Sequence, residues 1–138
     1  MFETDRFIAE CQRASTVSNS AGVHEIVART VSNPKEILRV LGEPRSAGLH
    51  TLFRSPELTV LNVVWGPRMN QLPHNHNMWA VIGIYTGRED NIFWRRVKGG
   101  VDGRIEAVGA KALLRGNTWT SGRKIMRNTG TPPLLHVS

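Results

Sequence analysis

Short extended segments separated by turn residues fill the chain after Pro44, and this pattern constrains the fold more than any other feature. Turn residues such as Gly, Pro, Asn and Asp stand between the apolar runs roughly every eight to twelve residues. Strands are expected at 52–54, 58–65, 78–86, 91–97 and 104–114, with weaker candidates at 124–127 and 134–137. The series predicts an all-β sandwich or a small antiparallel barrel.

The segments between these strands contain residues that favour turns. Residues 55–57 predict a hairpin between the first two strands. Residues 87–90 and 115–117 predict further turns, and the first of these is expected to join 78–86 and 91–97 as a second hairpin.

The residues before Pro44 have a helical pattern instead. Apolar side chains recur at helical spacing in 5–14 and again in 24–31. Residues 15–22 between them are rich in Ser, Asn and Gly, which is typical of a loop or an N-cap region. Two helices separated by a loop are therefore expected here.

A third helix is marked by its two ends. Asn33 suits an N-cap with Pro34 at the first helical position, and Gly42 ends the apolar run that follows. At 138 residues the chain is long enough for one core. We therefore expect a single domain, 1–138, in which a helical segment (1–43) covers one face or edge of a β-barrel (44–138).

The composition indicates a soluble globular protein, with 40% hydrophobic and 21% charged residues. No apolar run approaches the roughly 20 residues needed to cross a bilayer, so no membrane contact is expected. Residues 1–13 contain three acidic side chains and no apolar stretch, unlike a secretory signal. A cytoplasmic location is therefore expected.

The net charge of +7 weakly favours anionic ligands. Its basic residues are scattered and no aromatic RNA-binding pattern accompanies them, so a nucleic-acid partner is disfavoured. The single cysteine, Cys11, lies in a probable amphipathic helix and is therefore expected to be a buried or half-buried thiol. A catalytic role is not expected, because no neighbouring pattern supplies a base to activate it.

Two histidines with one residue between them, His74 and His76, stand immediately before an apolar run. Alternate side chains of an extended strand point to the same face, so the two imidazoles can share a metal ion. By the same alternation Tyr85 is expected on the other face, outside the site. The alternative is a polar strand start that binds nothing.

The sequence from His74 to Gly87 resembles the first motif of the cupin superfamily, G-x5-H-x-H-x3,4-E-x6-G. His74, His76 and Gly87 match it, and Ala80 stands in place of the glutamate. The resemblance implies a double-stranded β-helix, a small antiparallel barrel that holds a metal ion. Without the glutamate only histidine ligands remain. In this respect the chain resembles the thiol dioxygenase branch of the superfamily, typified by cysteine dioxygenase.

That resemblance implies ferrous iron, with another divalent metal as the alternative, and oxidation of a small thiol by O2 to a sulfinate. Arg54 lies where that family presents an arginine to the substrate carboxylate, although a solvated arginine at a hairpin end explains it equally well. His136 matches the histidine of the last core strand, with Ser138 in place of the family's tyrosine. His136 is expected either to bind the metal itself or to contact the residues that bind it.

The chain departs from that family near its end. The stretch 122–128 has no histidine where the family's third ligand lies, and the family's final strand would follow residue 138. A truncated barrel with an exposed last strand is expected, which would gain from pairing with a second copy.

Three hypotheses therefore stand. The chain is an iron-dependent thiol dioxygenase, a non-catalytic cupin that binds a metal or small ligand only, or a basic nucleic-acid-binding domain.

Overall fold

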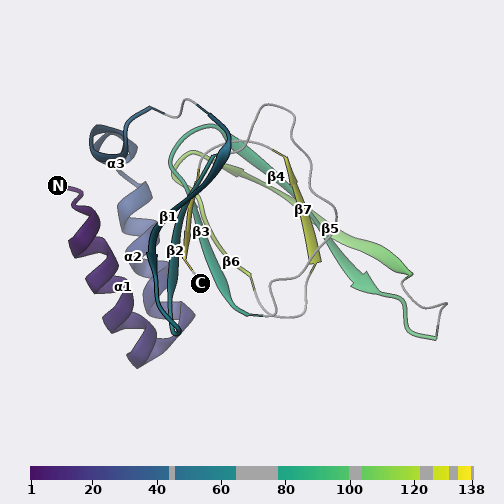
Figure 1. Ribbon diagram of the computed structural model, residues 1–138. Helices are drawn as coiled ribbons and strands as arrows, with labels where there is room; N and C mark the ends of the chain where they lie inside the picture. The colour runs from purple at the N-terminus through teal and green to yellow at the C-terminus, as the bar shows by residue number, and fades with distance from the viewer. Residues whose placement is uncertain (44–45, 65–77, 100–103, 122–125, 131–133, 138) are drawn as a thin grey trace.

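A computed structural model of the chain describes residues 1–43, 46–64, 78–99, 104–121, 126–130 and 134–137 (Figure 1). Within these ranges three helices are followed by eight strands. The helices are α1 (Thr4–Ser18), α2 (Ser20–Val31) and α3 (Pro34–Leu41). The strands are β1 (Gly48–Arg54), β2 (Thr59–Val64), β3 (Ala80–Ile84), β4 (Arg88–Arg96), β5 (Ile105–Leu114), β6 (Thr118–Ser121), β7 (Met126–Gly130) and β8 (Leu134–Val137). None of the helices in the described ranges is long and apolar enough to span a bilayer.

The strands form two antiparallel sheets that face each other. The larger sheet has five strands in the order β1-β2-β8-β3-β6, and the smaller has three in the order β5-β4-β7. Figure 1 shows the helices against the larger sheet, on the side away from the smaller one. The predicted β-barrel with a helical cover is thereby confirmed.

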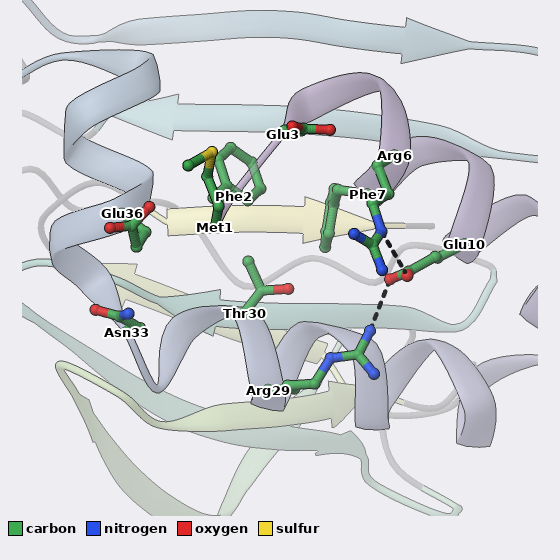
Figure 2. Close-up of a pocket in the computed structure, with 10 residues that line it drawn as sticks. All are labelled: Met1, Phe2, Glu3, Arg6, Phe7, Glu10, Arg29, Thr30, Asn33 and Glu36. Carbon is green, nitrogen blue, oxygen red and sulfur yellow. Dashed lines mark hydrogen bonds and ion pairs between the residues drawn. The ribbon is translucent and has the colours of Figure 1, made fainter.

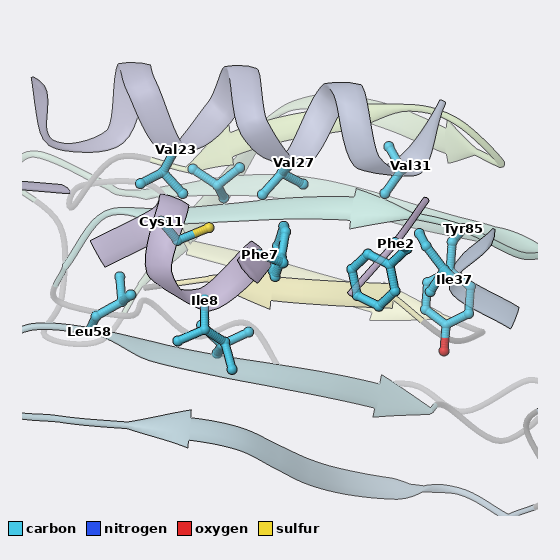
Figure 3. Close-up of a cluster of buried hydrophobic side chains, with 12 residues drawn as sticks. Phe2, Phe7, Ile8, Cys11, Val23, Val27, Val31, Ile37, Leu58 and Tyr85 are labelled. Atoms are coloured by element: carbon cyan, nitrogen blue, oxygen red, sulfur yellow. The ribbon is translucent and has the colours of Figure 1, made fainter. Parts of the chain in front are cut away.

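One apolar core joins the helices to the larger sheet (Figure 3). In α2, Val23, Val27 and Val31 recur at helical spacing and are completely buried against β3 and the neighbouring helix. Cys11 in α1 is completely buried in the same cluster, as the sequence predicts. This layer closes the outer face of the barrel.

The backbone of β3 approaches α2 most closely at Gly83. A Cβ atom at this position would lie 2.5 Å from Cγ1 of Val27 and 2.6 Å from Cγ1 of Val31. Real Cβ contacts are longer, so the absence of a side chain sets the spacing between this helix and the sheet.

The first two helices are longer than the sequence predicts. Residues 15–22 do not form a loop, because α1 continues to Ser18 and α2 begins at Ser20. The Ser and Thr hydroxyls at 15, 16 and 18 donate to carbonyl oxygens three or four residues earlier, so these polar residues are satisfied within the helix. Asn19, with φ of 51°, makes the reversal alone.

A second apolar core fills the space between the two sheets. Its buried members are Val63, Ile82, Ile84 and Leu113, with Leu61 and Trp119 packed against them. Phe93 of the smaller sheet stacks on Trp119 of the larger one, with ring centroids 5.0 Å apart. The side chains of both sheets therefore meet inside the barrel.

The strand pairing corrects two further predictions. Of residues 87–90 only Gly87 lies in the bend between β3 and β4, because β4 already begins at Arg88. The expected hairpin between 78–86 and 91–97 is wrong as well, since β3 pairs with β6 and β8 while β4 pairs with β5 and β7. Glu89 is a completely buried strand residue. Its segment was assigned to a turn because it contains several charged residues. The short strand β6 was not predicted.

The last strand of the chain lies in the middle of the larger sheet. β8 pairs with β2 on one side and with β3 on the other. The prediction of an exposed last strand is therefore wrong, because the barrel inserts β8 between two strands that are distant from it in sequence. The argument for pairing with a second copy through an exposed edge of β8 therefore no longer holds.

Candidate functional site

The histidine pair lies outside the described residues, in the segment that links β2 to β3. The register of the neighbouring strands nevertheless shows at which end of the larger sheet β3 begins. Val81, at the start of β3, pairs with Val137 at the end of β8, and Val60 of β2 pairs with the same Val137. His76 is only a few residues before this end of the sheet in sequence.

The backbone of His136 lies in the middle of the larger sheet. Its backbone pairs with Leu61 on β2 and with Ile82 on β3, and Ile82 pairs in turn with Trp119 on β6. Leu61, Ile82 and Trp119 all contribute to the core between the sheets. The position of His136 is therefore flanked on both sides by barrel-lining residues.

Arg54 is exposed at the end of β1, next to the predicted hairpin. The hairpin itself is confirmed, since the Ser55 amide donates to the Leu58 carbonyl at 2.8 Å. Arg54 pairs with Thr59, which shares a face of β2 with the interior residue Leu61. Arg54 thus stands at the rim of the barrel, at the same end of the sheet as the start of β3.

The described residues contain no group of three or more His, Cys, Asp or Glu side chains that could hold a metal ion. His74 and His76 lie outside these residues, so metal binding by the pair stays a prediction. Imidazole nitrogens are suitable donors for iron, copper, zinc and nickel, so the chemistry of the donor set fits a divalent transition metal.

Two buried polar residues of β4, Glu89 and Asn91, were missed by the sequence reading. Glu89 is 0% exposed and Asn91 is 1% exposed. They alternate with exposed neighbours and share the inner face with Phe93, which stacks on Trp119. The Asn91 amide donates to Glu89 Oε1 at 3.1 Å. The sequence carried no alternating signal for them, because the buried positions are polar and Ile92 is exposed, and the acidic residues there were assigned to a turn.

The opposite wall of this chamber contains further polar atoms. Within the described residues, Trp119 Nε1 is buried there and has no hydrogen-bond partner, whereas Thr118 lies on the face of β6 toward α2. Lys111 pairs with Asn91 across β4 and β5, and its ammonium lies 4.8 Å from the centroid of the Trp119 ring. The barrel interior is therefore apolar around Ile82, Ile84 and Leu113 and polar around Glu89 and Asn91.

Tyr85 lies outside the barrel, among the residues that face the helices (Figure 3). Its hydroxyl donates to Asn62 Oδ1 at 2.7 Å. Burial raises the pKa of Tyr85 above its ordinary value of 10.0, while the hydrogen bond to Asn62 opposes the rise. The expectation that Tyr85 takes no part in a barrel site agrees with this position.

Burial also raises the pKa of the Cys11 thiol from 9.0 to about 12, with the Glu10 carboxylate adding to the rise. The thiolate needed for nucleophilic chemistry is therefore scarce at neutral pH. The structure supports the prediction that Cys11 is a structural thiol.

The other two histidines have separate positions. His50 is exposed on β1. Nδ1 of His24 lies 2.6 Å from Thr120 Oγ1 in a half-buried contact between α2 and β6. Its role is to join the helical cover to the sheet.

A surface pocket of about 460 Å³ lies between the three helices (Figure 2). Phe2 and Phe7 form an aromatic pair in it, with centroids 5.7 Å apart. At its edge Glu10 accepts from Arg29 at 2.6 Å and lies 3.4 Å from Arg6. Both arginines are exposed and already paired with the same carboxylate, so neither is left free to orient an anionic ligand.

Solved structures with the same arrangement of strands were found by structural comparison. A RmlC-like cupin family protein with a double-stranded β-helix fold from Methanocaldococcus jannaschii superimposes with a TM-score of 0.56 over 70% of this chain and 82% of that one, at 10% identity. A cupin-2 domain protein from Shewanella frigidimarina gives 0.51 over 80% and 96%, also at 10% identity. This chain has the cupin fold.

Another cupin-fold neighbour is an enzyme. Hydroquinone 1,2-dioxygenase PnpCD, solved with Cd²⁺ and 4-hydroxybenzonitrile, matches this chain with a TM-score of 0.51 at 10% identity, over 80% of this chain and 72% of its own. No protein-family model and no curated protein matches the sequence significantly. At these identities the likeness extends to the fold and no further.

Proposed function

We propose that this cupin-fold chain is a metal-dependent oxygenase of the thiol dioxygenase type, with His74, His76 and His136 as candidate ligands of Fe(II) or another divalent metal. One observation carries the proposal. Arg54, the end of β8 next to His136, and the start of β3 after the histidine pair all lie at one end of the larger sheet.

The strand register supports this assignment because it brings together residues far apart in sequence. Arg54 pairs with Thr59, the next residue Val60 pairs with Val137, and Val137 also pairs with Val81. A barrel site at this end would combine a histidine donor set with a guanidinium at its rim. That combination suits a small ligand with one metal-binding group and one anionic group.

When bound, iron would supply a centre at which a thiolate and O2 react, with open coordination positions. The residues of this chain would position the substrate. Arg54 would hold the carboxylate of a small carboxylated thiol through paired N–H donors. The interior row of Leu61, Ile82 and Trp119 would exclude water from the thiol end.

Thiol-dependent oxygen uptake tests this function. Protein loaded with Fe(II) is incubated with cysteine, 3-mercaptopropionate or cysteamine, and O2 consumption is recorded with sulfinate formation. The proposal predicts uptake that requires iron and is abolished in His74→Ala/His76→Ala. Arg54→Gln should raise KM for the two carboxylated thiols and leave KM for cysteamine unchanged. An equal effect on all three thiols would refute the role of Arg54.

A second candidate function is a non-catalytic cupin that binds a metal or small ligand only. The absence of a histidine in 122–128 favours it. It predicts saturable binding of a divalent metal or of a thiol without O2 consumption. The same oxygen-uptake experiment, combined with a binding titration, distinguishes the two functions.

A further inference from the structure

We propose that the outer face of the β4–β5 ribbon is a self-association surface, on which a second copy of this chain docks with the same face. The ribbon consists of the paired strands β4 and β5, and its outer face is the one turned away from the barrel interior. The surface contains none of the candidate metal ligands, so it stands independently of the proposed oxygenase function.

The inward residues of β4 identify its two faces. Glu89 and Asn91 are buried and point into the barrel, as does Phe93, which stacks on Trp119. Successive side chains of a strand alternate between its faces, so the remaining residues of β4 up to Arg96, apart from Arg95, point outward. These are Arg88, Asp90, Ile92, Trp94 and Arg96.

The outward side chains of β5 are all apolar. Residues paired across two strands point to the same side of a sheet, so the partners of the outward β4 residues also face outward. They are Ile105, Ala107, Ala110, Ala112 and Leu114, and all except Ile105 are exposed. Val108 has no partner on β4, and this extra residue keeps Ala107 on the same side as Ala110.

This polarity is the reverse of the usual one for an antiparallel barrel. Such sheets are normally apolar toward the core and polar toward water. On β5 the charged residues lie on the other side instead, where Glu106 pairs with Arg95 and Lys111 lies against Trp119. None of the three helices covers the outer side, since they lie against the larger sheet (Figure 1). A contiguous exposed apolar face of this kind indicates a protein–protein contact.

The order of the outward side chains along β4 favours a second copy as the occupant. An acid is followed by two apolar residues and then by a base, in the order Asp90, Ile92, Trp94 and Arg96. With a twofold axis between Ile92 and Trp94, Asp90 of each copy faces Arg96 of the other. The same axis places β5 over β5, where apolar side chains meet. The face is therefore complementary to itself.

The contact should be weak and reversible. Asp90 also accepts from Arg88 of its own copy at 2.6 Å, but both side chains are 59% exposed and such a pair contributes little. A carboxylate has two oxygens and can accept a second guanidinium. The ribbon is about 30 Å long and two strands wide, so it offers only part of the roughly 800 Å² per partner that a standard interface buries.

Sedimentation velocity of the full-length protein between about 1 μM and about 1 mM tests this surface. We expect a reversible monomer–dimer equilibrium within that range. Asp90→Arg and Arg96→Asp each bring like charges together at both ends of the contact, and each should weaken dimerisation by about tenfold or more. Glu25→Arg and Arg13→Asp make the same changes of charge at exposed helical positions and should leave it unchanged.

An equimolar mixture of Asp90→Arg and Arg96→Asp separates this contact from any other. In a mixed pair the introduced arginine faces the introduced aspartate, and the native Arg96 of one copy faces the native Asp90 of the other. The mixture should therefore regain the dimerisation that each variant loses alone. If either charge variant fails to fold, Ala112→Glu at an exposed position of β5 should abolish the dimer instead.

Three results would overturn the inference. The unmodified protein could be a monomer at every concentration, which would leave the face to a different partner. The dimer could be unaffected by the substitutions on β4 and β5, which would place the contact elsewhere. The mixture of folded charge variants could stay monomeric, which would refute the pairing of Asp90 with Arg96.

Discussion

Replacing Gly83 with alanine tests the packing of the helical cover on the barrel. The new Cβ would meet Cγ1 of Val27 at 2.5 Å and Cγ1 of Val31 at 2.6 Å. Both methyl groups belong to a completely buried helix face, so neither can rotate into open space. The helix must move away from the sheet to relieve the overlap.

The cost is that of overpacking a core, typically 1–3 kcal/mol, less the small gain from removing a flexible glycine. We expect Gly83→Ala to lower the free energy of unfolding by about 2 kcal/mol, and Tm by about 6 °C for a domain of this size. Urea unfolding followed by circular dichroism gives both the midpoint and the slope.

Gly48→Ala is the matched control. A Cβ at Gly48 would meet its nearest atom, His50 Nε2, at 3.5 Å, an ordinary contact. Its effect should stay within about 0.5 kcal/mol. Replacing Val27 with alanine removes the methyl group that the new Cβ would meet, so it should partly rescue Gly83→Ala. The loss of stability in Gly83→Ala/Val27→Ala should therefore be less than the sum of the two single effects. Equal midpoints for Gly83→Ala and Gly48→Ala, or strict additivity in the double variant, would refute the packing described here.

Three other perturbations have definite expected outcomes. Tyr85→Phe leaves the buried Asn62 Oδ1 without its donor and should cost about 1–2 kcal/mol in urea unfolding, whereas no change would mean that the 2.7 Å bond is unimportant. The folded-state pKa of Cys11, about 12, lies above its ordinary 9.0, so its contribution to stability is complete below pH 9 and is lost as the pH rises from 9 to 12. Cys11→Ala should flatten this alkaline decline, and native Cys11 should resist a thiol reagent at pH 7 until the protein unfolds. Glu10→Gln removes a carboxylate shared by two exposed arginines, so the loss should be under about 1 kcal/mol and should shrink in high salt.

The sequence predicted the fold class because local chemistry and global fold agree over most of the chain. Asn33, Pro34 and Gly42 marked α3 at both ends, as the structure confirms. The turn at 115–117 is confirmed too, since the Asn117 amide donates to the Leu114 carbonyl and the Leu114 amide donates to Asn117 Oδ1. Local signals of this kind require no knowledge of distant contacts.

The errors arose where distant contacts decide the outcome. The insertion of β8 between β2 and β3 has no local signal, because its partners lie far from it in sequence. Glu89 was assigned to a turn because a charged residue seldom lies in a barrel interior. Of the candidate site, the structure places Arg54 and the His136 backbone at the larger sheet, whereas metal binding by His74 and His76 stays a prediction.

The metal content of the purified protein tests the central claim most directly. Protein prepared without a chelating tag and incubated with Fe(II) is desalted and analysed for iron, alongside His74→Ala/His76→Ala and the exposed-histidine control His50→Ala. A histidine site at the end of the barrel predicts near-stoichiometric iron in the unmodified protein and in His50→Ala, and loss of iron in the double variant. Iron-free protein, or iron that is retained in the double variant, would contradict it.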